Sequence, residues 1–220
     1  MNILVIGDPQ NLEECTLKFE DTHTYTLVSE HRDAAKFLDS ETLVFDFSIE
    51  DEPHQMEMYL QKSVIAFLNT TKASLAELTH PNHHQYAATL FGFNGMPTFL
   101  NRPLLEASLR KSEDKKSLEI ICQKLGTAYT LVEDRVGLVT PRIICMIINE
   151  AFYTVLEGTA SREDIDMAMK LGTNYPFGPF EWCKRIGIRH VYELLQAVYD
   201  DTKDERYRIC PLLKQEYLQQ

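Results

Sequence analysis

A glycine turn near the start of the chain is the first stretch whose residues could do chemistry. Residues 2–7, NILVIG, are typical of a buried parallel strand that ends at Gly7. In a dinucleotide-binding fold the pattern GxGxxG follows such a strand, and N–H groups at a helix start bind the pyrophosphate. Here the chain continues as DPQNL, in which Asp8 adds negative charge and Pro9 lacks an N–H. The pattern favours a Rossmann-like strand and turn without a nucleotide, and Gly7 remains a cofactor-binding candidate.

An acidic residue after the second predicted strand is another candidate for cofactor binding. Glu30 ends the strand predicted over residues 25–30. In dinucleotide-binding folds an acid at this place binds the ribose of NAD. Single acids after strands are also common in proteins that bind no nucleotide, so both interpretations stay open.

A histidine cluster could supply a proton-transfer group. His80, His83 and His84 lie within the sequence HPNHH, and imidazole titrates near neutral pH as a general base must. The stretch is polar and follows a predicted helix, which favours a solvated loop. No carboxylate or cysteine accompanies the histidines at ligand spacing, so the sequence predicts no metal site.

The composition bounds the class of protein. At 220 residues, with 44% hydrophobic and 25% charged residues, the chain can form one large globular domain or two small ones. The net charge of −11 disfavours nucleic acid or an anionic membrane as the main partner, although a local basic patch could still bind CoA. Scattered cysteines, no signal-peptide pattern and no apolar run of membrane-spanning length predict a soluble, cytoplasmic protein.

The first part of the chain alternates predicted strands and helices. Residues 99–109 are ambiguous between strand and loop. Further strands are predicted over residues 42–48, 64–68 and 129–132, and helices over residues 33–38, 57–62 and 112–125 and from Ser74 onward.

The later part has helical periodicity. Apolar residues recur every three to four positions over residues 140–156, which predicts a helix with a wide apolar face that needs a partner helix or a second subunit. We predict Thr140 as its N-cap, Pro141 as its first residue and Gly158 as its end. Ser161 should begin a second helix that ends at Gly172. Further helices are predicted around residues 191–199 and from Pro211.

Residues 158–182, GTASREDIDMAMKLGTNYPFGPFEW, closely resemble the C-terminal helical domain of 3-hydroxyacyl-CoA dehydrogenases. Residues 133–139, EDRVGLV, resemble the segment that crosses between this family's domains. The resemblance implies a shortened α/β Rossmann-like domain over residues 1–136. An all-α domain of the 6-phosphogluconate and hydroxyacyl-CoA dehydrogenase type would follow over residues 137–220. It also implies NAD as cofactor, a homodimer through the C-terminal helices, and acyl-CoA or another small ligand between the domains.

The same resemblance places the family's general base in the stretch LFGFNGMP, residues 90–97. This stretch is similar to the family's LHFFNPxP pattern, whose histidine takes the proton of the 3-hydroxyl group. Asn94 matches, but Phe91 occupies the histidine position. The family's orienting glutamate falls on Pro103, with Glu106 just beyond, and its helper asparagine falls on Pro141.

Asn69-Thr70-Thr71 resembles the family's NTS turn, whose serine hydrogen-bonds the substrate. Thr71 retains a hydroxyl group at that place. Alternatively, Asn69 and Thr71 only cap the helix that begins near Ser74.

Three functions follow from these patterns. The chain could be an active or weakly active 3-hydroxyacyl-CoA oxidoreductase of fatty-acid metabolism, a non-catalytic dimeric partner-binding module, or a binder of acyl-CoA. We favour a degenerate family member without normal NAD-dependent turnover. Its remaining site candidates are Thr71 and Asn94 for catalysis and Gly7 and Glu30 for the cofactor.

Overall fold

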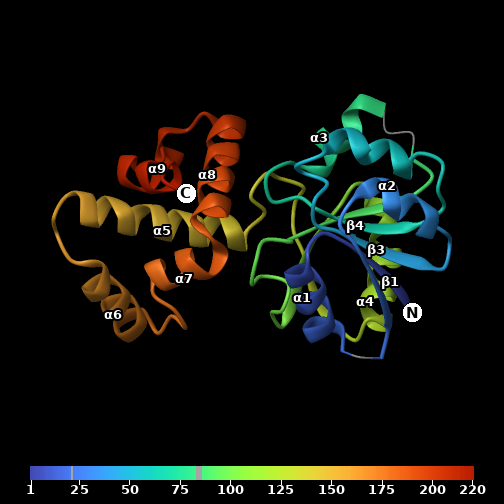
Figure 1. The fold of residues 1–220 in the computed structure, drawn as a ribbon, viewed down its shortest axis with the longest axis horizontal. Helices are drawn as coiled ribbons and strands as arrows, with labels where there is room; N and C mark the ends of the chain where they lie inside the picture. The colour runs from blue at the N-terminus through green and yellow to red at the C-terminus, as the bar shows by residue number, and fades with distance from the viewer. Residues whose placement is uncertain (21, 83–85) are drawn as a thin grey trace. The chain divides into compact units, whose positions relative to one another are not determined.

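The computed structural model describes residues 1–20, 22–82 and 86–220. These residues form two compact units, Met1–Leu138 and Val139–Gln220, each with its own packing (Figure 1).

The first unit is built on a seven-stranded sheet with the order β2-β1-β3-β4-β5-β6-β7. Neighbouring strands are parallel except for the antiparallel pair β5 and β6. The strands are β1 (Asn2–Ile6), β2 (Thr24–Val28), β3 (Thr42–Asp46), β4 (Ile65–Asn69), β5 (Thr89–Phe93), β6 (Leu104–Leu109) and β7 (Ala128–Leu131). β2 lies on one side of β1, and β3 lies on the other. The strand order therefore reverses between β1 and β3, and sheets of this kind bind ligands beside the carboxyl ends of the strands at such a switch point.

Helices cover both faces of this sheet. Helices α1 (Pro9–Phe19) and α4 (Lys115–Lys124) contribute to the core on one face, and α2 (His31–Ala34) and α3 (Leu75–Thr79) to the core on the other. Short 3₁₀ helices complete the unit: η1 (Ala35–Phe37), η2 (Pro53–Tyr59), η3 (His80–Asn82) and η4 (Ser112–Asp114). The α-helix expected over residues 57–62 is wrong, because this part of the chain forms η2 and then leads toward β4.

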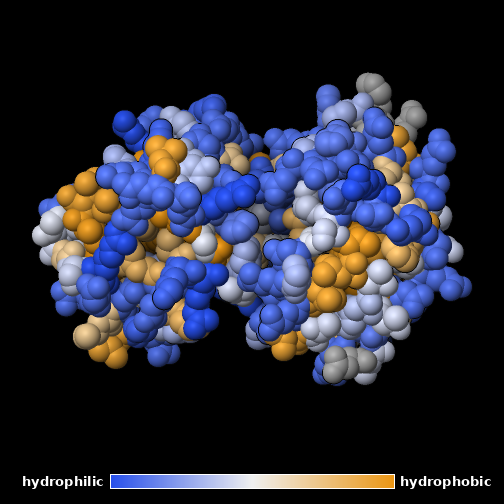
Figure 2. Space-filling view, viewed as in Figure 1, coloured by the Kyte–Doolittle hydropathy of each residue, from blue (hydrophilic) through white to orange (hydrophobic). Residues whose placement is uncertain are grey.

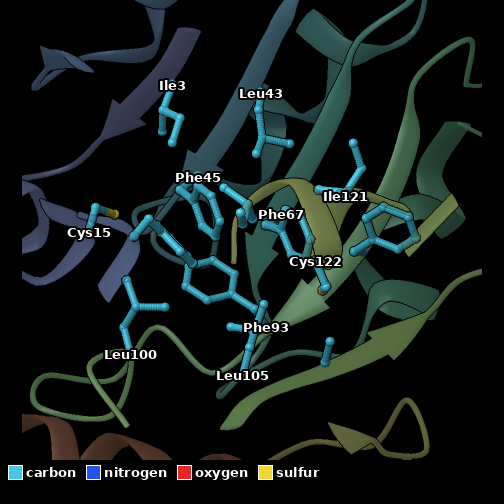
Figure 3. Packing of buried hydrophobic residues seen from close by; sticks show 14 of the residues in the cluster. Ile3, Cys15, Leu43, Phe45, Phe67, Phe93, Leu100, Leu105, Ile121 and Cys122 are labelled. Atoms are coloured by element: carbon cyan, nitrogen blue, oxygen red, sulfur yellow. The ribbon is translucent and has the colours of Figure 1, made fainter. Parts of the chain in front are cut away.

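Phenylalanine rings fill the core between the sheet and the helices α1 and α4 (Figure 3). The ring of Phe67 stacks on that of Phe45 with centroids 4.8 Å apart, and Phe93 meets Phe45 edge-on at 5.5 Å. Phe91 joins the cluster, with its ring 5.1 Å from that of Phe67. Such aromatic contacts stabilise a core beyond the apolar area that they bury.

The second unit consists of helices: α5 (Thr140–Leu156), α6 (Arg162–Thr173), α7 (Pro179–Ile186), α8 (Ile188–Thr202), η5 (Glu205–Tyr207) and α9 (Pro211–Tyr217). The helical unit and the mostly parallel sheet confirm the predicted fold class. No helix in the described ranges is long and apolar enough to cross a membrane.

Two predicted helix ends in this unit are wrong. Val139, not Thr140, holds the N-cap position of α5, and its side chain makes no cap. Helix α6 continues past Gly172 to Thr173, because Asn174 takes the left-handed conformation (φ 56°) that ends it. The capping role of Ser161 is confirmed, since its hydroxyl accepts a hydrogen bond from the N–H of Asp164 at 3.2 Å.

Candidate functional site

Polar side chains gather where β1, β3, β4 and β5 end. The carboxyl ends of parallel strands lie at one edge of a sheet, so residues far apart in the sequence meet there. We describe this edge residue by residue, beginning with the turn after β1.

The start of α1 is capped by its own side chains. The Asp8 carboxylate accepts a hydrogen bond from the N–H of Asn11 at 2.9 Å, and the Asn11 side-chain oxygen accepts one from the N–H of Asp8 at 2.9 Å. A Cβ atom added to Gly7 would lie 2.3 Å from that Asn11 oxygen. The turn is therefore filled by Asn11, and two N–H groups at the start of α1 are satisfied from within the chain.

Glu30 precedes α2 and faces solvent. Its carboxylate forms an ion pair with Arg32 at 2.7 Å, and both side chains are more than half exposed. Glu30 lies just after β2 and Gly7 just after β1, and the N–H of Gly7 donates to the carbonyl of Val28, the last residue of β2, at 3.0 Å. The two cofactor-binding candidates are thus at the ends of neighbouring strands.

Phe91 and Asn94 have different surroundings. The ring of Phe91 is fully buried in the aromatic core. Asn94 is also buried and follows the strand end, where its side-chain oxygen accepts a hydrogen bond from the N–H of Met96 at 3.3 Å. Glu106 lies opposite Asn94 on β6, and its backbone carbonyl accepts the N–H of Asn94 at 3.2 Å. Leu109, not Glu106, is the partner of Phe91 in the strand register.

Asn69 ties three strand ends together. Its side-chain oxygen accepts the N–H of Gly95 at 3.0 Å and lies 3.2 Å from the Thr71 hydroxyl, and its amide donates to the carbonyl of Phe47 at 3.4 Å. A Cβ atom on Gly95 would lie 2.8 Å from Asn69, so this close approach needs glycine. Asn69 and Thr71 do not cap α3. Ser74 does so, in a reciprocal pair with Glu77.

Glu50 is a site residue that sequence reasoning missed. It follows β3, and its carboxyl group contacts the turn after β4: Oε1 accepts the N–H groups of Lys72 and Ala73, and Oε2 lies 3.0 Å from the Thr71 hydroxyl. Desolvation raises the pKa of Glu50 to about 7, although these hydrogen bonds and the charge of Lys72 oppose the rise. A carboxyl group with such a pKa can hold or release a proton at neutral pH.

A second group of buried polar side chains surrounds Asp46, the last residue of β3. The imidazole Nε2 of His31 is 3.0 Å from Asp46 Oδ2, to which the Tyr59 hydroxyl also donates at 2.9 Å. All three side chains are buried, and the half-exposed Glu52 lies 3.4 Å from His31 Nδ1. The sequence carried no local signal for this group, because its members come from α2, β3 and η2.

The predicted histidine cluster is only partly described. His80 begins η3 and is exposed, whereas His83 and His84 lie outside the described residues. In the described part of the chain no three histidine, cysteine, aspartate or glutamate side chains are placed to hold a metal ion. The strand-end edge therefore offers a titrating carboxyl, a hydroxyl and amide groups as its chemically active parts.

Comparison with known proteins agrees with this architecture. Residues 137–219 match the family described as 3-hydroxyacyl-CoA dehydrogenase, C-terminal domain. The 3-hydroxyadipyl-CoA dehydrogenase of Escherichia coli K12 is 41% identical over 96 residues, which are 44% of this chain and 20% of the relative. The mitochondrial hydroxyacyl-coenzyme A dehydrogenase of Sus scrofa is 28% identical over 198 residues, which are 86% of this chain and 63% of the relative.

Solved structures share the fold over nearly the whole chain. The FadB2 protein of M. tuberculosis superimposes with a TM-score of 0.74 at 16% identity, covering 99% of this chain and 93% of that one. The (S)-3-hydroxybutyryl-CoA dehydrogenase PaaH1 of Ralstonia eutropha superimposes with a TM-score of 0.67 at 18% identity. The match covers 97% of this chain and 92% of that one. At such identities the likeness concerns the fold, and the two curated relatives above are matched over less than two thirds of their length.

Proposed function

Because the chain belongs to the 3-hydroxyacyl-CoA dehydrogenase family, we propose that it is a member without ordinary NAD-dependent turnover. The observation that carries this proposal is the turn after β1, where a bound dinucleotide would place its pyrophosphate. There the side chain of Asp8 accepts the backbone N–H of Asn11, and the side chain of Asn11 accepts that of Asp8. Pro9 has no backbone N–H to donate.

The residues of this turn do not fit NAD. A phosphate would have to displace a carboxylate that already caps the helix, and the like charges would repel each other at close range. Asn11 also fills the space beside Gly7. We therefore derive no chemical step through NAD.

The position of the general base supports the same proposal. Phe91 stands where the family pattern has histidine, and its ring is packed in the aromatic core. A phenyl ring cannot transfer a proton, and a general base typically contributes about 10²–10⁴-fold to the rate. What remains at the strand-end edge is the buried hydroxyl of Thr71 with Glu50 and Asn69, and an acyl-CoA is the ligand that the relatives' names suggest.

A titration tests the proposal directly. We expect NADH fluorescence to show no saturable binding at micromolar protein concentrations, and acetoacetyl-CoA to cause no NADH oxidation. Micromolar NADH affinity together with oxidation on adding acetoacetyl-CoA would contradict the proposal and establish the active oxidoreductase. Acetoacetyl-CoA is also titrated alone by calorimetry against the wild type and Thr71→Ala. Weaker binding by the variant supports a role for the hydroxyl, and equal binding argues against it.

We also propose that the chain forms a homodimer through its second unit. Helix α6 has no buried residue, and Met167 and Leu171, one turn apart, are 57% and 80% exposed. Ile143 and Leu156 of α5 are 54% and 49% exposed. Figure 2 shows apolar surface over the end of α5 and over α6. Exposed apolar side chains at such spacing are typical of a surface that another protein covers.

Substitution of Leu171 by glutamate is expected to convert such a dimer into a monomer, because the change buries an unpaired charge at the interface. Sedimentation velocity at micromolar concentration measures the species present. The matched control is Leu17→Glu, an equally drastic change of a 60% exposed leucine on α1 of the other unit, which should leave the dimer intact. A monomeric wild type would refute the dimer.

A further inference from the structure

The Thr71 hydroxyl faces two acceptors but has only one proton to donate. It lies 3.0 Å from Glu50 Oε2 and 3.2 Å from Asn69 Oδ1. The orientation of Asn69 is set by its other bonds, since Nδ2 donates to Phe47 and Oδ1 accepts from Gly95. If Glu50 is ionised, the hydroxyl can serve only one of the two oxygens at a time.

A proton on Glu50 resolves this shortage. The neutral carboxyl would donate from Oε2 to Thr71 Oγ1, which frees the hydroxyl proton for Asn69 Oδ1. Its other oxygen, Oε1, would still accept the N–H groups of Lys72 and Ala73, one for each lone pair. The Thr71 hydroxyl, both Glu50 oxygens and Asn69 Oδ1 then each have a partner.

The charges around Glu50 act in opposite directions, and the charge of Lys72 lowers its pKa. Lys72 is the nearest cation, but its ammonium group forms an ion pair with Asp51 at 2.7 Å, which offsets its attraction for Glu50. Glu77 and Asp134, which bind the start of α3, add negative charge a few residues further on. Arg135 belongs to the segment whose Gly137 N–H donates to the Thr71 carbonyl at 2.8 Å. The desolvation of the Glu50 carboxyl, described above, is the largest effect on its pKa and favours the protonated state.

We propose that Glu50 exchanges its proton near neutral pH and that this proton decides which acceptor the Thr71 hydroxyl serves. With Glu50 protonated, the bonds run from Glu50 to Thr71 and from Thr71 to Asn69. Once Glu50 is ionised, Thr71 donates to Glu50, and Asn69 Oδ1 keeps only the bond from Gly95. Glu50 is thus a positioning residue, which acts through the direction of a neighbouring hydroxyl. The inference goes beyond the proposed function, because it holds whether or not the chain binds NAD or an acyl-CoA.

Amide proton chemical shifts report both the ionisation of Glu50 and the change of acceptor of the Thr71 hydroxyl. In the wild type, the amides of Lys72, Ala73 and Gly95 should move downfield together between about pH 5 and about pH 9, with a midpoint near pH 7. Lys72 and Ala73 move because a carboxylate is a stronger acceptor than a neutral carboxyl. Gly95 moves because Thr71 no longer competes with it for Asn69 Oδ1. Two-dimensional ¹H–¹⁵N spectra across the titration measure all three.

Two variants separate the steps. Glu50→Gln mimics the protonated acid, since its amide can donate to Thr71, so all three amides should stay at their low-pH positions. Thr71→Val removes the hydroxyl, so Gly95 should cease to titrate while Lys72 and Ala73 continue. Asp134→Asn serves as the control for a neighbouring carboxylate: whatever its effect on the midpoint, all three amides should still titrate together.

The outcomes decide the proposal either way. A wild type in which none of the three amides titrates above about pH 6 would show Glu50 to be an ordinary ionised acid. Gly95 titrating equally in Thr71→Val would show that the hydroxyl does not carry the change. Because Thr71→Val alone tests the coupling, the proposal stays testable even if Glu50→Gln does not fold.

Discussion

Substitution of Asp46 by alanine is expected to lower the free energy of unfolding by about 3–5 kcal/mol. Asp46 is the shared partner of the His31 imidazole at 3.0 Å and the Tyr59 hydroxyl at 2.9 Å, and all three are buried. Its removal leaves a buried imidazole and a buried hydroxyl without that acceptor, and a buried polar group left without a partner destabilises the folded state. Urea denaturation of the wild type and the variant measures the difference.

The loss should also depend on pH. Burial by itself would lower the pKa of His31, but the hydrogen bond and charge of Asp46, with those of Glu52, outweigh burial and raise it. A raised histidine pKa stabilises the folded state fully below the unfolded value of about 6.5, and the contribution is lost as pH rises through the folded value. The gap between wild type and Asp46→Ala should therefore narrow with rising pH.

Tyr59→Phe is the matched control for this experiment. It removes one hydrogen bond to Asp46 and leaves the pair with His31, so a loss of about 1 kcal/mol with the wild-type pH slope is expected. If the free energy of unfolding of Asp46→Ala at pH 6 lies within about 1 kcal/mol of that of the wild type, the buried pair of His31 and Asp46 contributes little to stability and the prediction is wrong.

Phe91→His introduces a histidine at the position that the resemblance aligns with the family's general base. It is expected to destabilise the first unit by about 2–4 kcal/mol without creating dehydrogenase activity. Phe91 has no exposed surface and its ring packs 5.1 Å from that of Phe67, so an imidazole there loses packing and buries polar nitrogens. Urea denaturation measures the stability, and NADH oxidation with acetoacetyl-CoA measures the activity.

The pH dependence of Phe91→His should have the opposite sign to that of the His31 pair. An apolar site holds the imidazole neutral and lowers its pKa, so the folded state binds fewer protons than the unfolded state. Stability then falls as pH decreases below about 6.5. Phe91→Leu, which keeps the position apolar, should lose less stability and show no such slope. A Phe91→His protein as stable as the wild type, or one that oxidises NADH, would mean that this position opens onto a reactive site.

The sequence predicted the secondary structure where local patterns are strong. The first strand was predictable because a strand buried on both faces is a continuous apolar run, as in NILVI. Helix α5 was predictable because its apolar residues recur with helical periodicity. Helix ends were less accurate, since Asn174 and Val139 took the places predicted for Gly172 and Thr140.

The candidate site was predictable only in part. Asn69 and Thr71 were found because they resemble a short motif that is contiguous in the sequence. Glu50 was missed because it lies 21 residues before Thr71, and no spacing rule connects the two. The sequence did offer one signal for Glu50, an acid soon after the third strand. Neighbouring parallel strands end at the same edge of a sheet, so such an acid can reach the turn after the next strand.

The glycine turn shows what the sequence determined by itself and what required the tertiary structure. The sequence by itself determined that no GxGxxG pattern follows the first strand and that phenylalanine stands at position 91, because both are matters of residue identity. Only the tertiary structure placed Glu50 against Thr71 and Asp46 between His31 and Tyr59. Strand order decides which loops become neighbours, and burial decides whether their acids and imidazoles keep a proton. Both depend on the whole folded chain rather than on any local pattern of residues.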